Sequence, residues 1–183
     1  MKRAIYIGRF QGFHLGHLDV CKFIDAAPDI DALGIVLGST QYDRDHKSPV
    51  TPWALNPFTV AERTAMIEAA LAGQLTKPWS IHPVPDFHDW PRWHAAVVAS
   101  APPFQVLYTA DRDEAVFFRA RGTEVRRFPR VRDFHAGAIR LWMAKGEPWR
   151  HAVPEPVAEL LVGIDAPARL RELFARDQEV ARA

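Results

Sequence analysis

Short apolar runs alternate with longer segments of helical periodicity along most of the chain. Between the apolar runs, hydrophobic residues recur about every third or fourth position, which predicts helices. The apolar runs read as buried strands and cover Ala4–Ile7, Leu33–Leu37, Ile81–Val84, Gln105–Thr109 and Glu124–Phe128. Strands that alternate with helices predict an α/β fold, namely a Rossmann-like doubly wound parallel sheet of about five strands with helices on both faces.

Local signals mark where several helices begin and end. Thr59 and Glu62 form a capping-box pattern, so a helix is expected from there to about Ala72. Asp89 and Pro91 are typical of another helix start. After Asp133 the pattern is helical, with pauses at 146–148 and new starts at Pro154 and Pro167. The stretch 40–57 is polar and proline-rich, and we expect a long loop of the kind that is often functional or mobile.

Composition narrows the class of protein. The 183 residues suffice for one domain, which we place at 1–165, followed by a C-terminal helix or tail at 166–183. The net charge of +1 argues against broad electrostatic binding of nucleic acid or of a membrane surface. Cys21 is the sole cysteine, so we expect no internal disulfide and a cytoplasmic location. The first apolar run is too short for a signal peptide or a spanning helix.

Residues 8–17 read GRFQGFHLGH and carry the clearest chemical signal. They follow a strand and open a helix, and a helix N-terminus suits phosphate. His14 and His17 would add ring donors there, Arg9 would reach a second phosphate, and Gly16 would allow close approach of the backbone. The stretch matches neither the Walker A loop nor the dinucleotide fingerprint. The alternatives are a cap or surface histidine and a metal pair, although no cysteine or carboxylate ligand set stands beside the histidines.

Polar residues also follow the other predicted strands. They lie at 38–39, 85–89, 109–113 and 129–140. Parallel α/β sheets bind ligands at the carboxyl ends of their strands. We therefore expect these segments and residues 8–17 to hold the functional residues.

GRFQGFHLGH closely resembles the GxFxPxHxGH signature of the HxGH nucleotidyltransferase superfamily. From about residue 3 to residue 165 the chain resembles archaeal-type nicotinamide mononucleotide (NMN) adenylyltransferases. The resemblance includes LGSTQ, NPFTVAERTAMI, the segment 83–93 and the MAKGEPW region. Enzymes of this family join ATP to the mononucleotide: its phosphate attacks the α-phosphorus of ATP, and pyrophosphate leaves without a covalent intermediate.

The resemblance implies roles for individual residues. His14, His17, Arg9 and Arg140 would be the catalytic residues that hold the ATP phosphates through the transition state. The ATP site would also include Gly8, Phe10, Gly16, Asp111 and His135. The partners would be ATP and the amide or acid mononucleotide. Mg²⁺ would accompany ATP, held by phosphates and water rather than by a metal site of the protein. Because the family often forms oligomers, a homo-oligomer is one alternative for this chain. Nucleic acid and membrane partners are not expected.

The nicotinamide pocket implied by the resemblance contains Ser39, Asp86 and Trp93. Trp93 would stack on the cationic ring. Its alternative is a core tryptophan, and that of Asp86 is a turn residue. Asp111 is equally explained as a solvated loop residue. Glu62 and Arg63 match an ER pair of the family, and we assign both to structure.

The chain departs from the family pattern at three places. Gly12 replaces a proline, which we expect to loosen the turn without removing a contact. The second motif, usually SxTxxR, reads HAGAIR, so both hydroxyls are missing and His135 stands in place of the serine. Leu55 replaces an arginine, for which Arg44 or Lys47 of the longer loop is a candidate substitute.

Two other functions remain alternatives. One is adenylyl or cytidylyl transfer to another phosphate acceptor. The other is a nucleotide-binding regulatory protein without turnover, which the missing hydroxyls and Leu55 suggest. The sequence leaves amide and acid mononucleotide equally open.

Overall fold

The computed structural model of the protein describes residues 1–129 and 131–182. Five parallel strands form one sheet in the order β3-β2-β1-β4-β5. The strands are β1 (Arg3–Gly8), β2 (Ala32–Leu37), β3 (Trp79–Pro83), β4 (Val106–Tyr108) and β5 (Glu124–Arg126). The α-helices are α1 (Leu15–Asp25), α2 (Val60–Leu71), α3 (Trp90–Ser100), α4 (Arg112–Arg119), α5 (Ala136–Lys145), α6 (Glu155–Gly163) and α7 (Ala166–Arg182), with short 3-10 helices η1 (Trp53–Leu55) and η2 (Arg150–Ala152).

The chain divides into two compact units, each built from three segments. The first unit contains Met1–Arg9, Asp19–Thr40 and Gly73–Val131, and the second contains Phe10–Leu18, Gln41–Ala72 and Arg132–Ala183. The sheet belongs to the first unit. The predicted domain at 1–165 stays a prediction.

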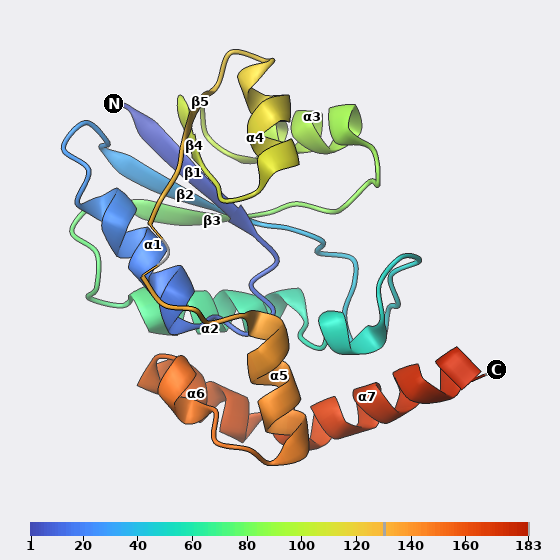
Figure 1. The fold of residues 1–183 in the computed structure, drawn as a ribbon. Coiled ribbons are helices and arrows are strands. Elements are labelled where there is room, and N and C mark those ends of the chain that lie inside the picture. Colours follow the sequence, from blue (N-terminus) through green and yellow to red (C-terminus); the bar gives the residue numbers. More distant parts are fainter. Residues whose placement is uncertain (130, 183) are drawn as a thin grey trace. The chain divides into compact units, whose positions relative to one another are not determined.

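The first unit has a core on one face of its sheet. Ile5, Val36 and Leu107 point from neighbouring strands to the same cluster as Val97 of α3 and Phe118 of α4. Figure 1 shows α3 and α4 on this face and α1 on the other. Because strand side chains alternate between faces, this arrangement needs apolar residues at every second position of each strand.

The opposite face of the sheet is also covered. Tyr6 and Tyr108 occupy the alternate strand positions and are buried, and Phe23 of α1 meets the Tyr108 ring edge to face at 6.2 Å. The predicted doubly wound sheet with helices on both faces is therefore confirmed. The chain reverses its winding between β1 and β4, and such a switch point is where α/β sheets bind ligands.

The second unit is helical, and its predicted capping box is present. The Thr59 hydroxyl accepts the Glu62 N–H at 3.2 Å, and the Glu62 carboxylate accepts the Thr59 N–H at 2.9 Å. Glu62 also pairs with Arg44 at 3.0 Å and Arg169 at 2.9 Å. Arg63 is fully buried. Both members of the ER pair thus have the structural surroundings expected for them.

Some element boundaries differ from the prediction. β5 ends at Arg126 rather than Phe128. The predicted loop 40–57 contains η1, with Trp53 and Ala54 buried. Residues 166–182 form the helix α7, so of the two alternatives for the C-terminal segment, a helix or a tail, the helix is found. No helix in the described part of the chain is long and apolar enough to cross a membrane.

Candidate active site

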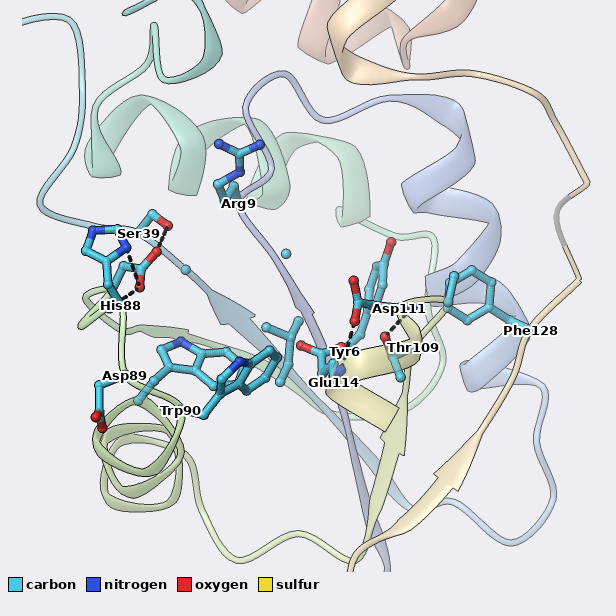
Figure 2. A pocket seen from close by; sticks show the side chains of 16 residues that line it. Tyr6, Arg9, Ser39, His88, Asp89, Trp90, Thr109, Asp111, Glu114 and Phe128 are labelled. Atoms are coloured by element: carbon cyan, nitrogen blue, oxygen red, sulfur yellow. Dashed lines mark hydrogen bonds and ion pairs between the residues drawn. The ribbon is translucent and has the colours of Figure 1, made fainter. Parts of the chain in front are cut away.

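A pocket of about 770 Å³ lies at the carboxyl ends of the strands in the first unit (Figure 2). That volume is typical of a small-molecule site. Six predicted site residues line it: Gly8, Arg9, Ser39, Asp86, Trp93 and Asp111. The other predicted residues belong to the second unit and are described below.

One end of the pocket is built around Asp86. Ser39 Oγ donates to Asp86 Oδ2 at 3.3 Å, and the His88 N–H donates to Asp86 Oδ1 at 2.9 Å (Figure 2). Asp86 is thus both the turn residue and the pocket residue that the sequence suggested. Ser39 and His88 have φ values of 51° and 50°, a left-handed conformation that costs free energy outside glycine. Such backbone strain gathers at ligand sites.

Arg9 is the one guanidinium among the described pocket-lining residues. Burial lowers its pKa, while the Asp86 carboxylate acts in the opposite direction. Because an arginine stays protonated in proteins, Arg9 brings a fixed positive charge to the pocket.

The other end of the pocket contains a buried carboxyl group that the sequence analysis missed. Thr109 Oγ1 accepts the Asp111 N–H at 3.0 Å, and Asp111 Oδ1 accepts the Glu114 N–H at 2.8 Å. Asp111 therefore caps α4, and it is also exposed, as its alternative of a solvated residue expected. Glu114 is 9% exposed. Burial raises its pKa to about 7, helped by the Asp111 charge and opposed by a hydrogen bond from Thr109.

Aromatic rings complete both ends of the pocket. Tyr6 and Phe128 meet edge to face at 5.8 Å beside Glu114 (Figure 2). Trp90 and Trp93 meet at 5.5 Å, nearly perpendicular. Trp93 lines the pocket and also packs against the core cluster, so its alternative as a core tryptophan is confirmed, and its stacking on the nicotinamide ring stays a prediction.

In the second unit, His14 and His17 stack at the start of α1. Their ring centroids are 3.6 Å apart and their planes differ by 22°. The His14 N–H donates to His17 Nδ1 at 3.2 Å. Since that nitrogen accepts, a neutral His17 carries its proton on Nε2 and presents an N–H donor there.

Burial favours the neutral form of both imidazoles. Burial lowers the pKa of His14 to about 4, with further lowering by His135 and Arg140. Burial, His14 and Arg140 place the pKa of His17 well below its usual range. His14 Nδ1 is buried without a hydrogen-bond partner among the described residues. A buried ring nitrogen left in this state indicates a ligand position.

Arg140 lies on α5 and is 4% exposed. Its Nε donates to the Ala54 carbonyl at 2.9 Å, and its Nη1 donates to the Gln11 carbonyl at 2.8 Å. These bonds orient the plane of the guanidinium. The Gln11 bond ties Arg140 to the same motif as the two histidines, and its charge lowers the pKa of both.

Backbone geometry explains the glycines of the first motif. Gly12 has φ +89°, which proline cannot adopt, so this glycine serves a different turn from the one the family proline would make. A Cβ at Gly16 would lie 3.0 Å from Cε1 and Nδ1 of His14. Gly16 therefore makes room for the His14 ring. Phe10, with φ 49°, places its ring 5.1 Å from that of His17.

The remaining predicted residues have simpler surroundings. His135 is the N-cap residue of α5, and its Nε2 lies 3.1 Å from Asp133 Oδ1. Its replacement of the family serine as a phosphate donor stays a prediction. Arg44 is engaged with Glu62, and Lys47 is exposed. That either residue takes the role of the arginine that the family has in place of Leu55 likewise stays a prediction.

The pocket also contains residues that the sequence did not single out. They are Tyr6, Ile7, Gly38, His88, Asp89, Trp90, Thr109, Ala110, Glu114 and Phe128. Half of them lie within the segments expected at strand ends, whereas Glu114 has the sequence context of an ordinary acidic residue in a first helical turn. The described residues contain no group of three or more His, Cys, Asp or Glu that would hold a metal ion.

Comparison with known proteins gives the family. A model of the cytidylyltransferase-like family matches residues 5–126. The nicotinamide-nucleotide adenylyltransferase of Thermoplasma acidophilum is 36% identical over 99% of this chain and 97% of its own. That of Thermoplasma volcanium is 38% identical over 97% of this chain and 96% of its own.

Solved structures agree on the fold. A bifunctional NMN adenylyltransferase/ADP ribose pyrophosphatase from Francisella tularensis has a TM-score of 0.75 at 21% identity, over 99% of this chain and 54% of that one. The chain thus spans about half of that bifunctional protein. A second structure of it, complexed with AMP and a manganese ion, has a TM-score of 0.70 at 20% identity. On the full-length similarity to its curated relatives, the chain belongs to the nicotinamide-nucleotide adenylyltransferase family of nucleotidyltransferases.

Proposed function

We propose that this protein transfers the adenylyl group of ATP to nicotinamide mononucleotide, which gives NAD and pyrophosphate. The observation that carries the proposal is the stacked pair of neutral imidazoles with Arg140 near it, within the GRFQGFHLGH motif. Relatives along the full length that are named for this activity support it.

The histidines and arginines would act on the phosphates. Attack on the α-phosphorus moves negative charge onto the non-bridging and leaving oxygens. His17 Nε2–H is a donor held in one orientation by the bond at Nδ1, and Arg140 is a cation oriented by two carbonyls. Donors fixed before the reaction stabilise such charge without reorganising. Arg9 would neutralise further phosphate charge.

The pocket would bind the two bases. We assign the nicotinamide ring to the end with Ser39, Asp86 and Trp93, and the adenine to the end with Asp111. The nicotinamide end carries the carboxylates of Asp86 and Asp89, on the side of Ser39 and Trp90 in Figure 2. A negative lining favours the cationic nicotinamide ring and disfavours the extra carboxylate of the acid form. We therefore infer that the amide mononucleotide is the preferred substrate.

A divalent ion, Mg²⁺, would enter with ATP. The described residues offer no metal cluster, and the buried imidazoles are nitrogen ligands, whereas Mg²⁺ prefers oxygen. Phosphate and water oxygens would therefore hold the ion, which supplies neutralisation of the phosphates. The manganese ion in the Francisella protein agrees with the use of a divalent metal.

Pyrophosphate release tests the proposal. ATP or CTP with Mg²⁺ is offered against nicotinamide mononucleotide, its acid form, phosphopantetheine and glycerol phosphate. We expect the fastest release with ATP and the amide mononucleotide. Turnover only with another acceptor would assign a different reaction of the superfamily. ATP binding without any release would favour the regulatory alternative.

A further inference from the structure

We propose that Asp177 on the C-terminal helix is a positioning residue, which keeps Arg140 in place by holding η1. This inference rests on the proposed function, since it concerns the grip of Arg140 on ATP phosphates. Asp177 itself contacts neither histidine nor Arg140 in any interaction described above, so its effect must pass through η1.

Asp177 acts as the missing cap of η1. Its Oδ1 accepts the Trp53 N–H and its Oδ2 accepts the Ala54 N–H, each at 2.8 Å. Those are the first two N–H groups of the helical turn, which have no acceptor within it. The residue before the turn is Pro52, whose side chain has no group that accepts a hydrogen bond. A carboxylate that accepts two backbone N–H groups makes charge-assisted bonds, which are stronger than neutral ones.

Ala54 connects this cap to Arg140. The same residue that donates its N–H to Asp177 accepts Arg140 Nε at its carbonyl, at 2.9 Å. The second anchor of the guanidinium is the Gln11 carbonyl at 2.8 Å, and Gln11 is itself fixed because its Oε1 accepts the Phe58 N–H at 3.0 Å. One anchor of Arg140 thus depends on the position of η1, and the other does not.

An apolar cluster and a cation–π contact dock α7 on η1 independently of Asp177. Leu173 clusters with Trp53 and Ala54, and the Arg176 guanidinium lies 3.8 Å from the centroid of the Trp53 ring. Removing the Asp177 carboxylate would therefore leave the helix docked while η1 loses its two capped N–H groups. We expect a shift of the Ala54 carbonyl, and with it a change in the orientation of Arg140, rather than unfolding.

Two features of the sequence agree with this role of Asp177 and η1. The resemblance implies that the loop containing η1 is longer than in the family and that Leu55 stands where the family has an arginine. Here η1 and α7 together hold the arginine of the second motif. The C-terminal helix, which has no motif residue of its own, thereby becomes part of the phosphate-binding apparatus.

The test is a double-mutant cycle on ATP affinity, measured by calorimetric titration of the full chain. Asp177→Ala should weaken ATP binding by about fivefold to twentyfold, while the exposed Glu179→Ala on the same helix should change it by less than about twofold. In an Arg140→Ala background the effect of Asp177→Ala should fall below about twofold, because the residue acts through Arg140. In the turnover assay, the KM for the mononucleotide should change by less than about twofold.

Equal effects of Asp177→Ala in both backgrounds would overturn the proposal, and so would an unchanged ATP affinity. If Asp177→Ala fails to fold, Asp177→Asn, which keeps one acceptor oxygen, replaces it in the cycle with a smaller coupling of the same sign. A wild-type protein that binds ATP but makes no dinucleotide would refute the proposed function while the cycle still decides on Asp177. A wild-type protein that binds no ATP would refute both.

Discussion

Replacing Gly16 by alanine should separate activity from stability. The added Cβ would lie 3.0 Å from two atoms of the His14 ring, where ordinary contacts begin near 3.4 Å. The ring therefore has to move by about 0.4 Å to restore normal contact. It stacks on His17 at 3.6 Å, so the pair would move together or separate. Either change displaces the donors that would face the phosphates.

The size of the effect follows from that displacement. A misplacement of about 1 Å in a catalytic group can cost about a hundredfold in rate, so about half of that shift should cost about tenfold in kcat/KM. Stability should move little, because alanine in a helix is favoured over glycine by up to about 1 kcal/mol, which offsets the crowding. Pyrophosphate release and thermal unfolding measure the two quantities on one preparation.

Gly163→Ala is the matched control. Gly163 lies in α6, and its added Cβ would meet no heavy atom of the described residues within 4 Å. It should raise stability by about 0.5 kcal/mol and leave activity unchanged. Full activity of Gly16→Ala would refute the claim that His14 must occupy its present position. A loss of activity that parallels a large loss of stability would show that only the fold was damaged.

Three further substitutions test other parts of the site. His17→Ala should reduce kcat at least about a hundredfold with an unchanged circular dichroism spectrum, because it removes an oriented donor. Trp93→Ala should raise the KM for the mononucleotide about tenfold and that for ATP less than about twofold, whereas Trp93→Phe keeps part of the ring contact. In the folded protein the pKa of Glu114 is about 7, above its ordinary value of 4.5. The free energy of unfolding should therefore fall as pH rises from about 4.5 to about 7, because the unfolded chain loses this proton first. In urea titrations Glu114→Gln should abolish that decline and be about 2 kcal/mol more stable than wild type at pH 8, whereas the exposed Asp113→Asn should not.

Each of these has a clear contrary result. Near-normal turnover of folded His17→Ala would remove His17 from the catalytic residues. Equal changes in both KM values would remove Trp93 from the mononucleotide end of the pocket. The same pH dependence of stability in wild type and Glu114→Gln would show that this carboxyl does not titrate with a raised pKa.

Features encoded by short stretches of sequence were predictable. The parallel sheet follows from the alternation of apolar runs and helical segments, and the capping box at Thr59 needs two residues three positions apart. The stacked histidines follow from their spacing at one helix start. The positive φ of Gly12 was not predictable, because the sequence does not show the backbone conformation of this turn.

Features that depend on remote contacts were not predictable. The raised pKa of Glu114 comes from its burial, which its neighbours in the sequence do not indicate. The capping of η1 joins positions 124 residues apart, and a polar helix at the chain end gives no local sign of it. In both cases the chemistry of one side chain is set by which distant segment packs on it.

The central claim is adenylyl transfer, and the fate of the α-phosphorus of ATP tests it most directly. Wild-type protein is incubated with nicotinamide mononucleotide, Mg²⁺ and ATP labelled at either the α- or the γ-phosphorus, and the products are separated by chromatography. We predict that the α-label appears in NAD and the γ-label in pyrophosphate. Transfer of the γ-label to the acceptor, or α-label that never enters the dinucleotide, would contradict the account.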